Sequence, residues 1–172
     1  MNAEQNHLLN AFSGAPEIDL QTVTVIYENW SARMRAKALM NGVGAQAEIY
    51  EHFELKDWSF ESLWEPQNLA DAVATACDSL IVILSATHLG DLPRVVNQWL
   101  SGWWEAKNHL PAALVALEDE DKMNDSATAA ALARLRNAAR AHGIELFCKQ
   151  QFAPDPQIVP QNRLRKLQFP SF

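Results

Sequence analysis

The chain has 172 residues and a mass of 19.3 kDa; 48% of its residues are hydrophobic and 20% are charged. These values exclude a disordered or repeat protein and predict one globular domain with a full core. The 21 acidic and 14 basic residues give a formal charge of −7, which argues against a general binder of nucleic acid or of anionic membranes. The two cysteines, Cys77 and Cys148, are expected to be reduced core residues, because a domain of this size needs no disulfide for stability.

The N-terminal residues 1–16 contain no Lys or Arg and no long apolar stretch. This composition predicts neither a signal peptide nor a membrane span. A cytoplasmic location without a membrane partner is therefore the default expectation.

Apolar runs of strand length alternate along the chain with segments of helical periodicity. The sequence predicts strands over 22–27, 47–55, 79–84, 112–117 and 143–147, and helices over 33–43, 68–77, 92–109 and about 126–142. Asn68 and Asp91 are the expected N-caps of the second and third helices, and Pro93 is tolerated in the first turn of the third.

This order of elements predicts an α/β protein with a three-layer α/β/α, flavodoxin-like fold. Short connections and right-handed crossovers favour a five-stranded parallel sheet in the strand order 2-1-3-4-5. The apolar run 79–84 should be its central strand, and the charged segment 47–55 should lie at or near an edge. The domain is expected to span 1–149, with its core from about 21, and the Pro- and Phe-rich segment 150–172 is interpreted as an arm on the body or on a neighbour.

Ligands of such sheets bind outside the carboxyl ends of the strands, where the winding of the chain reverses. Here that edge is formed by the loops 28–33, 85–91 and 118–124. In the first loop Asn29, Ser31, Arg33 and the N-terminus of the helix could converge on a phosphate. The alternative is equally open: Asn29 or Ser31 is only an N-cap, and Arg33 and Arg35 form only a solvated helix face.

Two short stretches on this edge carry a family resemblance. Residues 30–33 read Trp-Ser-Ala-Arg, and residues 88–100 read His-Leu-Gly-Asp-Leu-Pro-Arg-Val-Val-Asn-Gln-Trp-Leu. Both resemble the flavodoxin-like superfamily, and within it the branch of NAD(P)H-dependent FMN reductases and quinone reductases; Pro93 and Asn97 fall in register with the motif of that branch. The resemblance covers about 21–149 in element order.

The resemblance implies an FMN-binding reductase that takes hydride from NAD(P)H and reduces a quinone or a similar small acceptor. Ser31 and Arg33 would hold the FMN phosphate, and His88 would stand where an aromatic residue stacks on the isoalloxazine ring. The residues that would surround the ring are Thr87, His88, Leu89, Gly90, Asp91 and, from the loop after the fourth strand, Glu118. No side chain is assigned a catalytic role, because the flavin would carry the chemistry.

Departures from the family pattern support a flavin-free alternative, a flavodoxin-like domain that acts in protein–protein interaction. Trp30 replaces the glycine of the phosphate loop, and Glu28 places a carboxylate beside it. The segment 118–121 brings four carboxylates to the loop after the fourth strand, where like charges disfavour a phosphate.

Three tryptophans lie within six positions of the third helix, at Trp99, Trp103 and Trp104. They exceed what one buried stripe needs, and Trp is enriched at subunit interfaces. This pattern predicts a homo-oligomer that forms through the Trp-rich third helix or through the C-terminal arm.

Other functional classes have weaker support. A receiver-type phosphoacceptor shares the strand order, but its third strand would end in aspartate, whereas this one ends in Ser85. His52, Glu54 and His88 with the segment 118–121 match no spacing of known metal sites, and no metal is expected. The chain has no Gly-x-Ser-x-Gly elbow and no P-loop.

Overall fold

The computed structural model describes residues 21–47, 53–107, 112–122 and 125–148. The strands are β1 (Gln21–Tyr27), β2 (Phe53–Ser59), β3 (Ile81–Ser85), β4 (Ala112–Leu117) and β5 (Ile144–Cys148). The α-helices are α2 (Trp30–Ala47), α3 (Pro66–Cys77), α4 (Arg94–Ala106) and α5 (Ser126–Ala141). Three short 3-10 helices lie in the loops: η2 (Ser62–Trp64), η3 (Leu89–Asp91) and η4 (Glu120–Lys122).

The five strands form one parallel sheet in the order β2-β1-β3-β4-β5. Both the parallel pairing and the predicted order 2-1-3-4-5 are confirmed. All five residues of β3 are buried, as expected of the central strand. The winding of the chain reverses between β1 and β3, which is where the ligands of such sheets bind.

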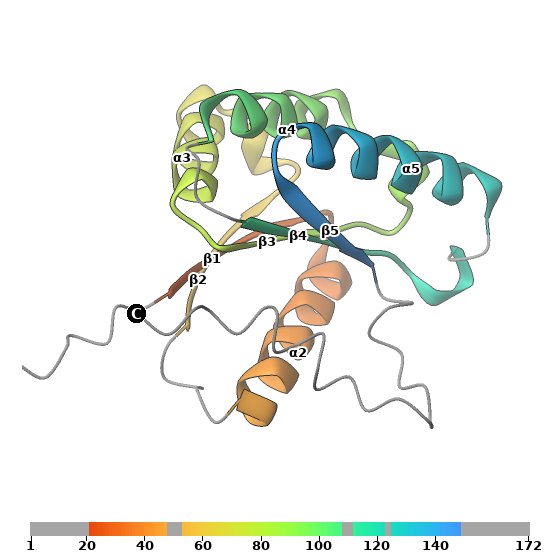
Figure 1. Ribbon diagram of the computed structural model, residues 1–172, viewed down its shortest axis with the longest axis horizontal. Helices are drawn as coiled ribbons and strands as arrows, with labels where there is room; N and C mark the ends of the chain where they lie inside the picture. Colours follow the sequence, from red (N-terminus) through yellow and green to blue (C-terminus); the bar gives the residue numbers. More distant parts are fainter. Residues whose placement is uncertain (1–20, 48–52, 108–111, 123–124, 149–172) are drawn as a thin grey trace, which may run out of the picture.

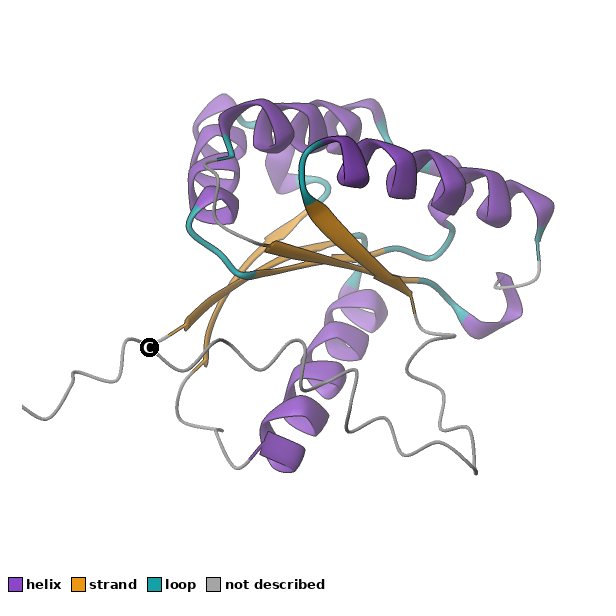
Figure 2. Cartoon of the chain, viewed as in Figure 1, coloured by secondary structure: helices purple, strands orange, loops and turns teal. Residues whose placement is uncertain are grey.

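Helices cover both faces of the sheet (Figure 1): α3, α4 and α5 lie on one face and α2 on the other. Each face has its own hydrophobic core. On one side Leu84 and Leu114 join the residues of α3 to α5; on the other, Val25 and Ile83 pack with Met40 of α2. Figure 2 shows the resulting layers of helix, strand and helix, which is the predicted three-layer fold.

The second strand begins later than the sequence predicts. Ala47 ends α2, and β2 runs over Phe53–Ser59 instead of 47–55, while 48–52 lie outside the described residues. Phe53 and Leu55 pack on the core next to α2, whereas Trp58 packs on the opposite core. The alternation of side chains therefore continues to Trp58, beyond the predicted end. The position of β2 at an edge of the sheet is confirmed.

Helix α2 is longer than the predicted segment 33–43. It begins at Trp30, directly after Asn29, and buries Ala32, Ala36 and Met40, which are four residues apart and so share one face. This apolar stripe attaches α2 to the sheet.

The N-cap predicted at Asn68 is wrong, because α3 already begins at Pro66, with Glu65 in the N-cap position. Proline is favoured in the first turn because its fixed φ suits the helix and its missing N–H would have no partner there. Asn68 lies inside the helix, and its Nδ2 donates a hydrogen bond to the Ser62 carbonyl at 3.1 Å.

The N-cap predicted at Asp91 is also wrong. Asp91 ends η3, and α4 begins at Arg94 with Pro93 in the N-cap position. In contrast, α5 has a side-chain cap, since Asp125 accepts a hydrogen bond from the Ala127 N–H at 3.0 Å.

The tryptophans of α4 do not form the exposed aromatic surface that the sequence predicts. Trp99 and Trp103 are 0% exposed and stack on each other, with ring centroids 5.7 Å apart. Trp104 is half-buried and stacks on His142 at 6.0 Å. The exposed tryptophans are instead Trp30 and Trp64, at 66% and 60%. The other surface predicted for oligomerisation, the C-terminal arm, lies outside the described residues.

The structure places neither cysteine in a disulfide. Cys148 is buried in β5, and Cys77 is half-buried at the end of α3. Burial raises the pKa of the Cys77 thiol, because it disfavours the charged thiolate. No helix in the described part of the chain is both long and apolar enough to cross a membrane.

Candidate functional site

Three loops meet at the carboxyl edge of the sheet, as the sequence predicts. The loop after β1 joins β3 through the Glu28 N–H, which donates to the Ser85 carbonyl at 3.0 Å. The loop after β3 joins β4 through the Ala86 N–H, which donates to the Leu117 carbonyl at 3.0 Å. Most candidate residues lie on these loops, so their partners decide what the edge can bind.

Asn29 is the N-cap of α2. Its Oδ1 accepts a hydrogen bond from the Ala32 N–H at 3.0 Å, and its Nδ2 donates to Thr87 Oγ1 at 3.1 Å. One of the helix N–H groups that a phosphate could use is thus bonded to the protein itself. The neighbouring Ser31 is exposed. The capping interpretation of Asn29 is confirmed.

Replacing Asn29 by alanine should lower the free energy of unfolding by about 1 kcal/mol, because the Ala32 N–H loses its acceptor. Ser31→Ala is the matched control. Ser31 is exposed in the first turn of α2, so this variant should change the free energy of unfolding by less than about 0.5 kcal/mol. Urea unfolding of both variants measures the difference. Equal effects would contradict the capping role of Asn29.

Arg33 is bound to the edge strand. Its Nε donates to Asp57 Oδ2 at 2.5 Å, and its guanidinium lies 5.8 Å from the ring of Tyr27 and 5.4 Å from the ring of Trp30. The hydrogen bond with Asp57 raises the pKa of Arg33 above its usual value. Because β2 lies on the outer side of β1, this pairing directs Arg33 away from the loops after β3 and β4.

Arg35 lies one half-turn further along α2 and reaches the opposite way. It forms an ion pair with Asp119, and its Nη2 donates to the Ala86 carbonyl at 3.1 Å. Asp119 follows β4, and Ala86 follows β3. The expectation that Arg33 and Arg35 form a solvated helix face is therefore wrong for both.

Glu28 binds a backbone N–H of the loop after β3, the loop that would surround the flavin ring. One of its carboxylate oxygens accepts a hydrogen bond from the Thr87 N–H at 2.5 Å. The Thr87 hydroxyl already accepts from Asn29, so both polar groups of Thr87 that face the first loop have partners in the chain. The carboxylate of Glu28 thus stands where a bound anion would have to come.

Glu118 is a buried carboxylate, 3% exposed, at the end of β4. It accepts hydrogen bonds from the Leu89 N–H at 2.6 Å and from the Thr128 hydroxyl at 2.8 Å. These bonds connect the loop after β3, the loop after β4 and the first turn of α5. Glu118 therefore holds the loops together from inside the protein.

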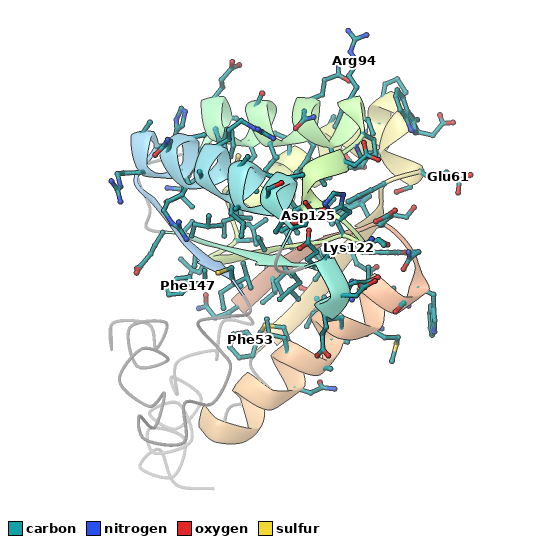
Figure 3. All side chains as sticks on the ribbon, turned by 90° about the vertical axis from the view of Figure 1, so that its right-hand side faces the viewer. Phe53, Glu61, Arg94, Lys122, Asp125 and Phe147 are labelled. Atoms are coloured by element: carbon teal, nitrogen blue, oxygen red, sulfur yellow. The ribbon has the colours of Figure 1, made fainter. Side chains whose placement is uncertain are left out.

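The remaining ring-pocket candidates differ in exposure. Leu89 is buried in the core, Gly90 and His88 are half-buried, and Asp91 is exposed. His88 Nε2 lies 3.2 Å from Asp125 Oδ2, at the start of α5. Figure 3 shows Asp125 there, beside Lys122 of the preceding turn. His88 thus lies next to an acidic side chain, but its Nε2 forms no hydrogen bond with a described residue.

The structure brings Asn29, Thr87 and Glu118 into one network of loops, but it separates Arg33 from the proposed ring pocket. Sequence reasoning missed Asp57 and Thr128, which bind two of the candidates. Asp57 would have been found if the predicted second strand had been extended through Trp58. In such a strand Asp57 lies on the same face as Phe53 and Leu55, which is the face toward α2. Nothing in the sequence around Thr128 indicates its role.

Two alternatives can be compared with this geometry. Among the described residues, no three His, Cys, Asp or Glu side chains lie close enough to hold a metal ion; His52 lies outside them. Ser85 is buried at the end of β3, and its hydroxyl donates to the Ala32 carbonyl at 2.7 Å. It therefore ties β3 to α2 at the position where a receiver has its phosphorylated aspartate.

In the comparisons with known proteins, no family model matches the chain and no curated protein matches it in sequence.

Proposed function

We propose that this chain is a flavodoxin-like domain that works without flavin and binds a basic protein partner at the carboxyl edge of its sheet. The observation that carries the proposal is the pairing of the charged groups at this edge. Asp57 holds Arg33, Asp119 holds Arg35, and Glu28 holds the Thr87 N–H.

A flavin phosphate would have to compete with these carboxylates. It carries close to two negative charges, so each unneutralised carboxylate nearby raises the cost of binding it. Glu28 is exposed in the very loop that would receive the phosphate. Displacing Asp57 or Asp119 from its arginine would leave a carboxylate without its partner beside a dianion.

The same edge is well suited to a cationic protein surface. Trp30 and Trp64 follow the carboxyl ends of neighbouring strands and expose most of their side chains. Exposed acidic residues follow the strands as well: Glu28, Glu61, Glu65, Asp91 and Asp121. Figure 3 shows Glu61 pointing outward. Exposed indoles bind Lys and Arg through their ring faces, and a negative surface accelerates encounter with a basic partner.

Absorption spectroscopy tests the absence of flavin. The purified protein should be colourless, and FMN added in excess should be removed completely by gel filtration. A flavin band that is retained and then bleached by NAD(P)H would overturn the proposal. Arg33→Ala should leave FMN binding unchanged at the background level. If Arg33 bound the FMN phosphate, the variant would lose about 1.5 to 3 kcal/mol of binding free energy.

The partner surface is tested with a fluorescent peptide of six arginines separated by glycines, at physiological salt. We expect Trp30→Ala and Trp64→Ala each to weaken its binding about two- to fivefold, the size of an exposed cation–π contact. The control Glu145→Gln removes an exposed carboxylate of β5, which pairs with Ala113 in the amino half of β4, away from the edge. Equal losses of peptide affinity in all three variants would mean that the peptide binds by general charge attraction. That result would contradict a partner-binding surface at the carboxyl edge.

The second candidate is the NAD(P)H-dependent FMN reductase. The fold supports it, because the sheet has the flavodoxin-like strand order and the loops after β1, β3 and β4 converge at the switch point. The resemblance of residues 30–33 and 88–100 to the reductase motifs supports it too. The same spectrum separates the two candidates.

A further inference from the structure

A groove of about 300 Å³ is lined by residues of α4, of α5 and of the loop before α4. Both helices lie on the same face of the sheet (Figure 1). Its apolar wall is formed by leucines of both helices and of the loop before α4, among them Leu89, Leu100 and Leu135. Ligand pockets in proteins begin at about this volume, so the groove suits a small molecule.

Glycine and alanine explain why the groove exists. A Cβ at Gly102 would lie 3.2 Å from Cγ2 of Val73, so this glycine lets α4 approach α3 closely. On the other side α5 presents Ala131 and Ala138, whose short side chains do not fill the space beside α4. Helix α4 thus leans on α3 and leaves a gap next to α5.

Two close contacts between the loop or helix segments lie at the borders of the groove. At one end η3 lies against α5, since a Cβ at Gly90 would lie 3.0 Å from Cβ of Ala127. At the other end Trp104 lines the groove and stacks on His142, with ring centroids 6.0 Å apart.

Four residues with polar side-chain groups line the groove: Asn97, Ser101, Trp104 and Arg134. Trp104 contributes its ring to the groove wall, since its indole Nε1 is fully buried and out of reach of a ligand. Arg134 of α5 is the only charged residue among the described residues that line the groove, and no described carboxylate forms an ion pair with it. Ser101 adds a hydroxyl at the rim. A guanidinium prefers a carboxylate, so Arg134 favours a ligand that carries one.

We propose that this groove is a binding site for a small organic acid with an apolar body and a single carboxylate. The apolar body lies against Leu89, Leu100 and Leu135, and the carboxylate accepts hydrogen bonds from Arg134. The site shares no charged group with the carboxyl edge, so the inference is independent of the proposed function.

The test is a titration of the full chain with 2-naphthoate, observed in the ¹⁵N–¹H spectrum of the indole groups. The Trp104 signal, assigned by its loss in Trp104→Phe, should shift to saturation. The neutral probe 2-naphthamide has the same ring and should bind about tenfold more weakly, since it lacks the charge. No shift of the Trp104 signal, or equal affinity for the two probes, would overturn the proposal.

Two arginines of α5 provide a matched pair of variants. Arg134→Gln should weaken 2-naphthoate binding about tenfold, whereas Arg136→Gln should not, because both arginines are exposed on α5 but only Arg134 lines the groove. Ala138→Leu, which fills the groove, should abolish binding while the thermal midpoint stays the same or rises. Equal losses in both arginine variants, or retained affinity in Ala138→Leu, would also count against the site.

Discussion

Trp99→Ala is expected to lower the free energy of unfolding by about 3 to 5 kcal/mol. Trp99 is 0% exposed and stacks on Trp103, so its removal leaves a large cavity between α4 and the sheet. Chemical denaturation followed by far-UV circular dichroism measures the loss. Because a domain of this kind is stable by about 5 to 15 kcal/mol in total, the variant should be close to its unfolding threshold.

Two further variants separate packing from hydrogen bonding at this position. No described residue accepts a hydrogen bond from the Trp99 indole N–H, so Trp99→Phe should cost clearly less than Trp99→Ala. Trp64→Ala removes a tryptophan that is 60% exposed and should cost less than about 1 kcal/mol. A loss at Trp64 as large as at Trp99 would contradict the assignment of the core.

Glu118→Ala is expected to lower the free energy of unfolding by about 2 to 4 kcal/mol, because the Leu89 N–H and the Thr128 hydroxyl lose a charged acceptor. Denaturant unfolding provides the measurement. The exposed Glu145→Ala in β5 is the control and should change stability by less than about 0.5 kcal/mol.

A double-mutant cycle between Glu118→Gln and Thr128→Val shows whether the two side chains act together. The hydroxyl of Thr128 lies 2.8 and 2.9 Å from the two oxygens of Glu118, so we expect a coupling free energy of about 1 kcal/mol. Additive effects would mean that the pair contributes nothing to the joining of β4 to α5.

Most of the fold could be predicted from the sequence because the pattern of apolar residues is strong. The uninterrupted run that ends at Leu84 identified the central strand, since only a strand covered on both faces tolerates such a run. The boundaries of β2 and α2 could not be predicted as well. Strand β2 alternates weakly on an exposed edge, and the start of α2 depends on the cap at Asn29.

The candidate site was harder to predict than the fold, because its meaning depends on partners that are far away in the sequence. Arg33 and Asp57 are 24 residues apart, and Arg35 and Asp119 are 84 apart. Only the register of β2 beside β1 and the position of the loop after β4 bring these charges together. In the sequence Arg33 predicts anion binding; in the structure Arg33 and Arg35 both form ion pairs with carboxylates of the chain itself.

Helix α2 is the only helix that the structure describes on its face of the sheet, and this has a consequence for how the molecule unfolds locally. The two ion pairs attach its first turns to opposite sides of the sheet, at β2 and after β4. Local opening in proteins follows the least anchored units, so α2 is a natural unit of partial unfolding that would uncover Val25 and Ile83. High salt weakens partly exposed ion pairs, and the frequency of this opening should therefore increase with ionic strength, whereas the layer of α3, α4 and α5 is held by apolar packing that salt does not screen.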